Sequence, residues 1–161
     1  MVYDYIVIGS GFGGSVSAMR LAEKGYSVLV IEQGKHFSEA DFPKKSSDLA
    51  KFFWIPMIRF FGIQKLTFFK NVLILSGTGV GGGSLVYANT HLVPGDAFFH
   101  HESWAKFANW KEVLEPFYKL AKHMLGTTSV KKMHKADDIL YQVAKDRNVE
   151  NSFKAVDVGV Y

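Results

Sequence analysis

The sequence predicts an α/β fold, a parallel sheet with helices, and three observations near the N-terminus support this prediction. Residues 3–8 form a nearly continuous apolar run, which is typical of a parallel strand buried on both faces. Four glycines follow directly, within residues 9–14. Apolar residues then recur at helical spacing over residues 15–24, and a second apolar run covers residues 26–31. We therefore expect a strand, a glycine turn, a helix and a second strand, in that order.

The glycine turn matches the dinucleotide fingerprint G-x-G-x-x-G at Gly9, Gly11 and Gly14. In this motif the first glycine permits a tight turn, the second admits a pyrophosphate, and the third lets the helix pack on the strand. Gly25 stands where a helix C-terminal cap belongs. Glu32 ends the second apolar run 18 residues after Gly14, close to the position of the acid that binds a ribose. The pattern predicts a Rossmann-like FAD/NAD(P)-binding fold, with FAD or NAD favoured over NADP.

Composition excludes several classes of site. The chain has 161 residues, 48% of them hydrophobic, so we expect a globular domain with one core. It has no cysteine, which excludes disulfides, cysteine-ligated zinc, iron–sulfur clusters and a thiol nucleophile. The net charge of +4 comes from scattered lysines, whereas nucleic-acid binding favours a clustered patch. The six histidines lack the spacing of metal ligands. We expect neither a nucleic-acid partner nor a metal.

The N-terminus shows no pattern of an export signal. Met1 leads almost directly into the first apolar run, with no basic segment and no small-residue cleavage site, so a cytoplasmic protein is expected. No run of 18 apolar residues exists anywhere in the sequence, which excludes a membrane-spanning helix.

An aromatic excursion, residues 35–70, lies between the second strand and the next apolar run at residues 71–75. We favour a core-packed connector for this excursion. The alternative is a segment that lines an apolar pocket or touches a membrane. The aromatic and apolar residues that would do so are Phe52, Phe53, Trp54, Phe60 and Phe61.

A second glycine-rich loop, residues 76–84, follows the run at 71–75. Consecutive glycine N–H groups can form an anion-binding nest. Two such loops in one domain suggest a ligand longer than one phosphate site can hold. An NAD-dependent dehydrogenase is therefore a weaker alternative than an FAD enzyme.

The joint pattern resembles glucose-methanol-choline (GMC) oxidoreductases, and their cholesterol oxidase-like bacterial members in particular. The resemblance rests on GSGFGGS, on the later E-x-G beginning at Glu32, and on GVGGGSLVYANT over residues 79–90. The stretch KFFWIPMIRFFGIQ and the segment at residues 109–126 also fit this subgroup. The resemblance implies that residues 1–161 are the incomplete N-terminal FAD-binding domain of a larger flavoprotein. Within it, residues 90–161 would form the start of the substrate or cap region.

The resemblance also implies where FAD binds, non-covalently or through a histidine. The ADP half would lie on the first loop and Glu32, and the flavin on the second loop. Asn89 takes a flavin-side role, although GMC sequences commonly carry asparagine two positions earlier, where Tyr87 stands here. The implied cofactor-binding residues are Gly9, Gly11, Phe12, Gly13, Gly14, Glu32, Gln33, Gly79, Val80, Gly81, Gly82, Gly83, Ser84 and Asn89.

The remaining chain predicts further elements without a catalytic group. Helical spacing covers residues 111–126, with Pro116 bending the helix or marking its first turn, and its apolar face is expected in the core. A helix over residues 136–145 begins with an acidic pair, and residues 153–161 alternate as a strand. In the family, the proton-abstracting histidine lies in a C-terminal portion that nothing here matches. The catalytic residues are therefore unknown.

The function that the sequence favours is an FAD-dependent oxidoreductase acting on the CH–OH group of an alcohol, with a sterol as one candidate substrate. The family implies that a base removes the hydroxyl proton while hydride passes to the flavin. The alternative is a catalytically incomplete FAD-binding fragment that needs a missing C-terminal portion or a second chain. Peripheral membrane contact and homo-oligomer formation are further expected partnerships, the latter because an incomplete sheet leaves its edges exposed.

Overall fold

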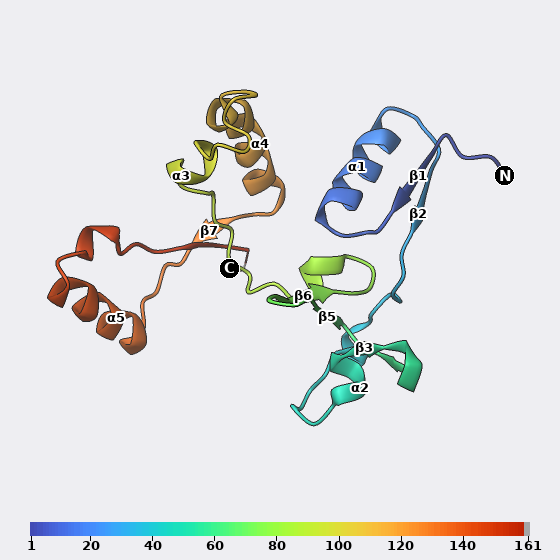
Figure 1. Cartoon of the computed structure of the whole chain (residues 1–161), viewed down its shortest axis with the longest axis horizontal. Helices are drawn as coiled ribbons and strands as arrows, with labels where there is room; N and C mark the ends of the chain where they lie inside the picture. Colours follow the sequence, from blue (N-terminus) through green and yellow to red (C-terminus); the bar gives the residue numbers. More distant parts are fainter. Residues whose placement is uncertain (160–161) are drawn as a thin grey trace. The chain divides into compact units, whose positions relative to one another are not determined.

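The computed structural model describes residues 1–159. The chain divides into two compact units, residues 1–87 and 88–161 (Figure 1). The length of the chain had predicted a single core. The first unit begins with β1 (Tyr5–Ile8), α1 (Phe12–Glu23) and β2 (Val28–Ile31). The two strands pair in parallel from Tyr5 opposite Val28 to Ile8 opposite Ile31. This confirms the predicted strand–helix–strand order, with each strand starting two residues later than expected.

The predicted burial of the first strand on both faces is wrong for this chain. Ile8 is 86% exposed and Ile6 61%. Within residues 1–159, β1 has β2 as its sole strand neighbour, so its faces and free edge are left largely uncovered. The apolar sequence of the strand indicates a fully covered position, which these residues alone do not build.

The turn after β1 shows why two of its glycines are needed. Gly9 has a φ of +92°, which favours glycine, and its N–H donates to the Ile31 carbonyl oxygen at 2.7 Å. A Cβ on Gly14 would lie 1.9 Å from the Gly9 carbonyl oxygen. Helix α1 can thus lie against the strand end because residue 14 has no side chain. At the other end, Gly25 follows the helix with a φ of +89°, as predicted for a C-terminal cap.

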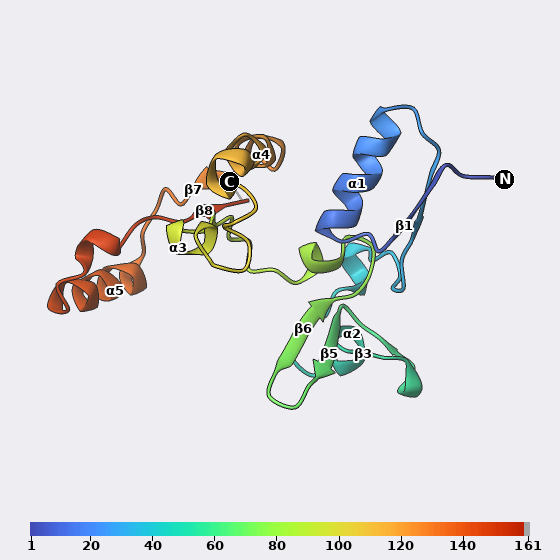
Figure 2. The ribbon, with the colours of Figure 1, turned by 45° about the horizontal axis from the view of Figure 1, so that its top comes forward.

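The aromatic excursion has regular structure of its own. It contains α2 (Leu49–Phe52), the antiparallel pair β3 (Trp54–Ile55) and β4 (Phe60–Phe61), and β5 (Gln64–Phe68). Strand β5 forms an antiparallel hairpin with β6 (Leu73–Gly77), with Phe68 opposite Leu73 (Figure 2). Sequence periodicity predicted one strand at 71–75; it missed the partner strand because polar and apolar residues mix in Gln64–Phe68.

A small core lies beneath this hairpin. Ile63 is 6% exposed and Thr78 is 1% exposed, and the Thr78 N–H donates to the Ile63 carbonyl oxygen at 2.9 Å. Trp54 packs edge-to-face on Phe61 with ring centroids 5.4 Å apart. Phe52, Phe53, Trp54 and Phe60 are half-buried, which agrees with a packed connector, while Phe61 is 47% exposed.

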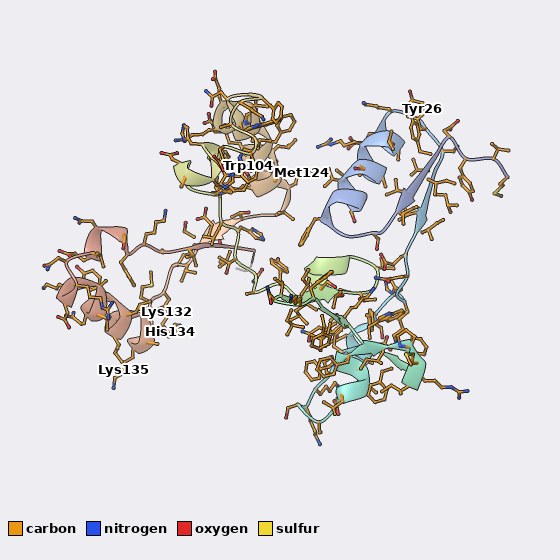
Figure 3. All side chains as sticks on the ribbon, viewed as in Figure 1. Tyr26, Trp104, Met124, Lys132, His134 and Lys135 are labelled. Atoms are coloured by element: carbon orange, nitrogen blue, oxygen red, sulfur yellow. The ribbon has the colours of Figure 1, made fainter. Side chains whose placement is uncertain are left out.

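The second unit contains α3 (Asp96–Phe99), α4 (Trp110–Met124), β7 (Thr128–Ser129), α5 (Lys135–Asp146) and β8 (Asp157–Val158). The side chain of Trp104, labelled in Figure 3, donates from Nε1 to the Phe98 carbonyl oxygen at 2.7 Å. Strands β7 and β8 pair antiparallel. Four 3₁₀ helices complete the described elements of the whole chain: Glu39–Asp41, Pro56–Ile58, Gly82–Leu85 and Glu150–Ser152.

Both predicted helices of this unit are confirmed, with one correction. Pro116 lies inside α4, where it cannot donate to the carbonyl oxygen four residues earlier. The apolar face of α4 is not core in this unit, since Phe117 is 62% exposed and Met124 52%. Few elements surround the helix within the described part of the unit. The predicted strand at 153–161 is reduced to β8, and residues 160–161 lie outside the described residues.

Over residues 1–159, none of the helices combines the length and the apolar character that crossing a bilayer requires. The assignment of residues 1–161 to one FAD-binding domain, with a substrate or cap region starting near residue 90, stays a prediction.

Replacing Gly14 with alanine is expected to destabilise the first unit, because the methyl group would overlap the Gly9 carbonyl oxygen. Overpacking of this kind costs about 1–3 kcal/mol. Gly13→Ala is the matched control, since a methyl group there meets no described atom within 4 Å and alanine is the better helix former. Urea unfolding of both variants measures the difference, and equal stabilities would contradict the packing described.

Candidate functional site: a cavity between two glycine loops

A cavity of about 810 Å³ lies in the first unit, where the ends of β1, β2 and β6 meet the two glycine-rich loops. Seven of the residues predicted to bind cofactor line it: Gly9, Gly11, Phe12, Glu32, Gln33, Gly82 and Gly83. Tyr87 also lines the cavity, and its ring lies edge-on to Phe12 with centroids 6.0 Å apart. A cavity of about 520 Å³ around α5 in the second unit contains none of the predicted residues.

The two glycine loops touch each other directly, although 71 residues separate their contact points. A Cβ on Gly82 would lie 2.8 Å from the Gly11 Cα, and a Cβ on Gly83 would lie 3.0 Å from the Phe12 ring. A side chain at residue 82 would push the loops apart, and one at residue 83 would displace the Phe12 ring. The structure therefore brings together the two loops that the sequence assigns to one long ligand.

Glu32 is the charged group of the cavity, and its carboxylate is held by protein donors. Its Oε2 accepts from the Ser10 N–H at 2.9 Å and from the Ser10 hydroxyl at 2.8 Å. Its Oε1 accepts from the Gly34 N–H at 3.0 Å. The Gly79 backbone also hydrogen-bonds to it. A carboxylate has about four lone-pair sites, so a ribose hydroxyl would share an oxygen with one of these donors.

These hydrogen bonds decide the charge of Glu32. Its partial burial acts to raise the pKa, but the bonds from Ser10, Gly34 and Gly79 outweigh burial and lower the pKa below its ordinary value. The carboxylate is therefore ionised at neutral pH. An ionised group at the end of β2 can accept hydrogen bonds from a ligand but cannot donate one.

Ser10 connects Glu32 to the second loop, a role that the sequence analysis did not assign. Its hydroxyl donates to Glu32 and accepts from the Gly81 N–H at 3.1 Å. The Ser15 hydroxyl donates to the Ser10 carbonyl oxygen at 2.6 Å. Ser10 is 7% exposed. The fingerprint treats this position as variable, so no sequence pattern marks it.

The second loop has a shape that its glycines permit. The φ angles of Gly79, Gly81 and Gly82 are +133°, +102° and +54°. The Val80 N–H donates to the Lys35 carbonyl oxygen at 3.1 Å, and the Ser84 N–H to the Gly81 carbonyl oxygen at 3.2 Å. Gly79, Val80, Gly81 and Ser84 shape this loop without lining the cavity.

Three other predicted residues are placed as follows. Gly13 and Gly14 lie in the first turn of α1, where Gly14 serves the packing on β1. Asn89 belongs to the second unit and has a φ of +58°; its role beside the cofactor stays a prediction.

The geometry of the first loop fits a phosphate-bearing nucleotide. Gly11 is the N-cap of α1, and a Cβ built on it meets no described atom within 4 Å, so the space beside it is open to the cavity. The first turn of α1 carries no acidic residue. The N–H groups of a helix's first turn have no partner within the helix and attract anions. Among the described residues, no group of three His, Cys, Asp or Glu side chains forms a metal site.

Known proteins are similar to this chain around the first glycine loop and also over nearly its whole length. A family model described as an NAD(P)-binding Rossmann-like domain matches residues 7–40, which confirms the predicted fold class. Over 99% of its length the chain is 46% identical to a cholesterol oxidase of Mycobacterium tuberculosis and 43% identical to one of Acinetobacter baumannii. A long-chain-alcohol oxidase of Arabidopsis thaliana is 37% identical over 52% of the chain.

The chain spans 28% of the length of the Mycobacterium tuberculosis protein, 29% of the Acinetobacter baumannii protein and 11% of the Arabidopsis thaliana protein. The similarity confirms the predicted resemblance, and it extends over the aromatic excursion and the second unit as well as the glycine loops.

The lowered pKa of Glu32 predicts a pH-dependent contribution to stability. A carboxyl whose pKa is lower in the folded state stabilises the fold fully above its unfolded value near 4.5, and this contribution is lost as the pH falls through the folded value. Glu32→Gln is expected to reduce the slope of unfolding free energy against pH below about pH 5, by at most about 1.4 kcal/mol per pH unit.

Denaturant titrations between about pH 3 and 7 measure this slope for the parent and the variant. Glu102→Gln, a change at an exposed carboxyl of the second unit, controls for the loss of a carboxyl as such. Identical slopes for the parent and Glu32→Gln would contradict the hydrogen bonds assigned to Glu32.

Proposed function

Because this chain corresponds to the N-terminal portion of the cholesterol oxidase-like GMC oxidoreductases, we propose that its cavity binds FAD and that the complete protein oxidises the CH–OH group of an alcohol. The observation that carries the proposal is the meeting of two glycine loops in one cavity beside an ionised glutamate. The first loop carries the dinucleotide fingerprint and suits the single pyrophosphate of FAD, while the second loop supplies further backbone on the other side of the cavity.

The first loop is proposed to hold the ADP half. The open side of Gly11 admits the pyrophosphate against the N-terminus of α1. Glu32 accepts a hydrogen bond from a ribose hydroxyl, sharing an oxygen with a protein donor. Phe12 and Gln33 also line the cavity.

The second loop is proposed to face the flavin. Gly82 and Gly83 line the cavity, and their lack of side chains lets a planar ring approach the backbone. When bound, FAD would accept the hydride that leaves the alcohol carbon. The residues of this chain bind and orient the cofactor, and we propose that the base that removes the hydroxyl proton lies in a portion of the complete protein outside residues 1–161.

A sterol is the proposed substrate class, since the relatives that match nearly the whole chain are named cholesterol oxidases. A long-chain alcohol is the alternative, because the plant relatives that match about half of the chain are named for that substrate. The two substrate classes are distinguished by measuring how fast peroxide, or the reduced electron acceptor, forms with cholesterol and with a long-chain primary alcohol.

The experiment that tests the proposed function is a visible absorption spectrum of the complete protein, followed by heat release and mass identification of the nucleotide. FAD release with alcohol turnover is the expected result. FAD release by residues 1–161 alone without turnover would indicate a catalytically incomplete fragment. Colourless protein that takes up NADH in place of FAD would overturn the proposal in favour of a nicotinamide enzyme.

Gly11→Val is expected to fold normally and to lose FAD, because its side chain would fill the open space of the cavity. Gly95→Val is a matched control. Gly95 is also a helix N-cap with extended backbone, and a Cβ there also meets no described atom within 4 Å. Calorimetric titration with FAD should give at least a hundredfold loss of affinity for Gly11→Val and no change for Gly95→Val. Equal affinities in the two variants would mean that the first loop is not the pyrophosphate site.

We also propose that the aromatic excursion contacts a membrane surface. Met57, Phe68 and Phe69 are 96%, 74% and 61% exposed, and Met57 and Phe68 line one surface cavity with Lys65. Between Asp48 and Asp96 the sequence contains no acidic residue but four basic ones: Lys51, Arg59, Lys65 and Lys70. Exposed apolar side chains among cations suit a surface of anionic lipid.

The double variant Phe68→Ser/Phe69→Ser is expected to lower binding to vesicles of phosphatidylcholine and phosphatidylserine by about tenfold, since each side chain loses the apolar burial that insertion supplies. Sedimentation with the vesicles measures the bound fraction. Phe107→Ser, which changes a 69% exposed phenylalanine of the second unit, is the control. Unchanged binding in the double variant would exclude this surface as the contact.

A further inference from the structure

Ser10 is placed to link the two ends of the proposed cofactor site. Its hydroxyl lies between the Glu32 carboxylate at 2.8 Å and the Gly81 N–H at 3.1 Å. Glu32 belongs to the ribose end, and Gly81 belongs to the loop that faces the flavin. With 7% of its surface exposed, Ser10 is held in this position by the packing around it.

The donors on Glu32 differ in how easily they can yield to a ligand. Ser10 N–H, Gly34 N–H and the Gly79 backbone are fixed by the chain. The Ser10 hydroxyl is the donor whose proton can rotate about a single bond. A ribose hydroxyl that approaches Oε2 therefore competes first with the Ser10 hydroxyl. When the Ser10 hydroxyl rotates, the lone pairs of its oxygen, which accept the hydrogen bond from the Gly81 N–H, change direction.

We infer that Ser10 is a positioning residue, which couples occupation of the ribose end to the conformation of the loop at residues 79–84. This inference rests on the proposed FAD site and adds a residue that the fingerprint leaves variable. Ser10 does not touch the reacting atoms; it acts through Glu32 on one side and through Gly81 on the other.

The coupling predicts opposite behaviour for a short and a long ligand. ADP occupies the first loop alone, whereas FAD needs both loops. In Ser10→Ala the carboxylate gains a free lone pair for the ribose, so ADP affinity should stay within about twofold of the parent or rise. FAD affinity should fall about five- to tenfold, because the Gly81 N–H loses its acceptor. The ratio of FAD to ADP affinity is therefore the diagnostic quantity.

Calorimetry with ADP and FAD on the complete protein gives this ratio for the parent, Ser10→Ala, Ser10→Thr and Ser15→Ala. Ser10→Thr keeps the hydroxyl and should restore the ratio. Ser15→Ala removes a hydroxyl that contacts Ser10 from the helix side and should change both affinities by the same factor. The visible spectrum of bound FAD should shift in Ser10→Ala alone, since only that variant alters the flavin-side loop.

Three results bear on the inference in different ways. A fall of ADP and FAD affinity by the same factor in Ser10→Ala, or no change in either, would overturn it. A parent protein that binds no FAD would instead overturn the proposed function. If Ser10→Ala does not fold, the amide resonance of Gly81 in the parent decides the question: ADP alone should shift it, and an unmoved resonance would overturn the coupling.

Discussion

The site depends on the placement of one negative charge, the Glu32 carboxylate, among backbone N–H groups. A partly buried carboxylate is stable when donors surround it, and here the donors come from three different segments. Ser10 lies in the first loop, Gly34 follows β2, and Gly79 lies in the second loop. Satisfying the charge therefore brings together segments that lie far apart in the sequence, and the cavity forms between them.

Glycine makes this arrangement possible because the segments meet backbone to backbone. Gly34 lies so close to Gly79 that a Cβ would come within 2.4 Å of the Gly79 nitrogen. Gly82 meets Gly11 in the same way. The glycines have different roles in this contact. Some face the open cavity, while others allow close packing or adopt a positive φ. A glycine count alone does not distinguish these roles, but the direction of the absent Cβ does.

The N-terminal unit could be predicted well, because local signals and tertiary structure agree there. The apolar runs, the glycine turn and Glu32 follow a spacing that the parallel strand pair and α1 require. Strand β5 was missed, since Gln64–Phe68 has no clear alternation and forms through its pairing with β6. Ser10 was missed for a related reason: its importance arises from Gly81, 71 residues away, which no local pattern reveals. The exposure of β1 and α4 was not predicted, because apolar sequences indicate covered faces and residues 1–159 supply few elements to cover them.

Hydrogen–deuterium exchange of the complete protein, with and without FAD, tests most directly that the two glycine loops form one cofactor site. Peptides covering residues 9–14 and 79–84 should both exchange more slowly when FAD is bound, and peptides from the exposed tip at residues 68–72 should not change. Slower exchange in the first loop alone would mean that the second loop does not take part in binding the cofactor, and the single-site description of the cavity would be wrong.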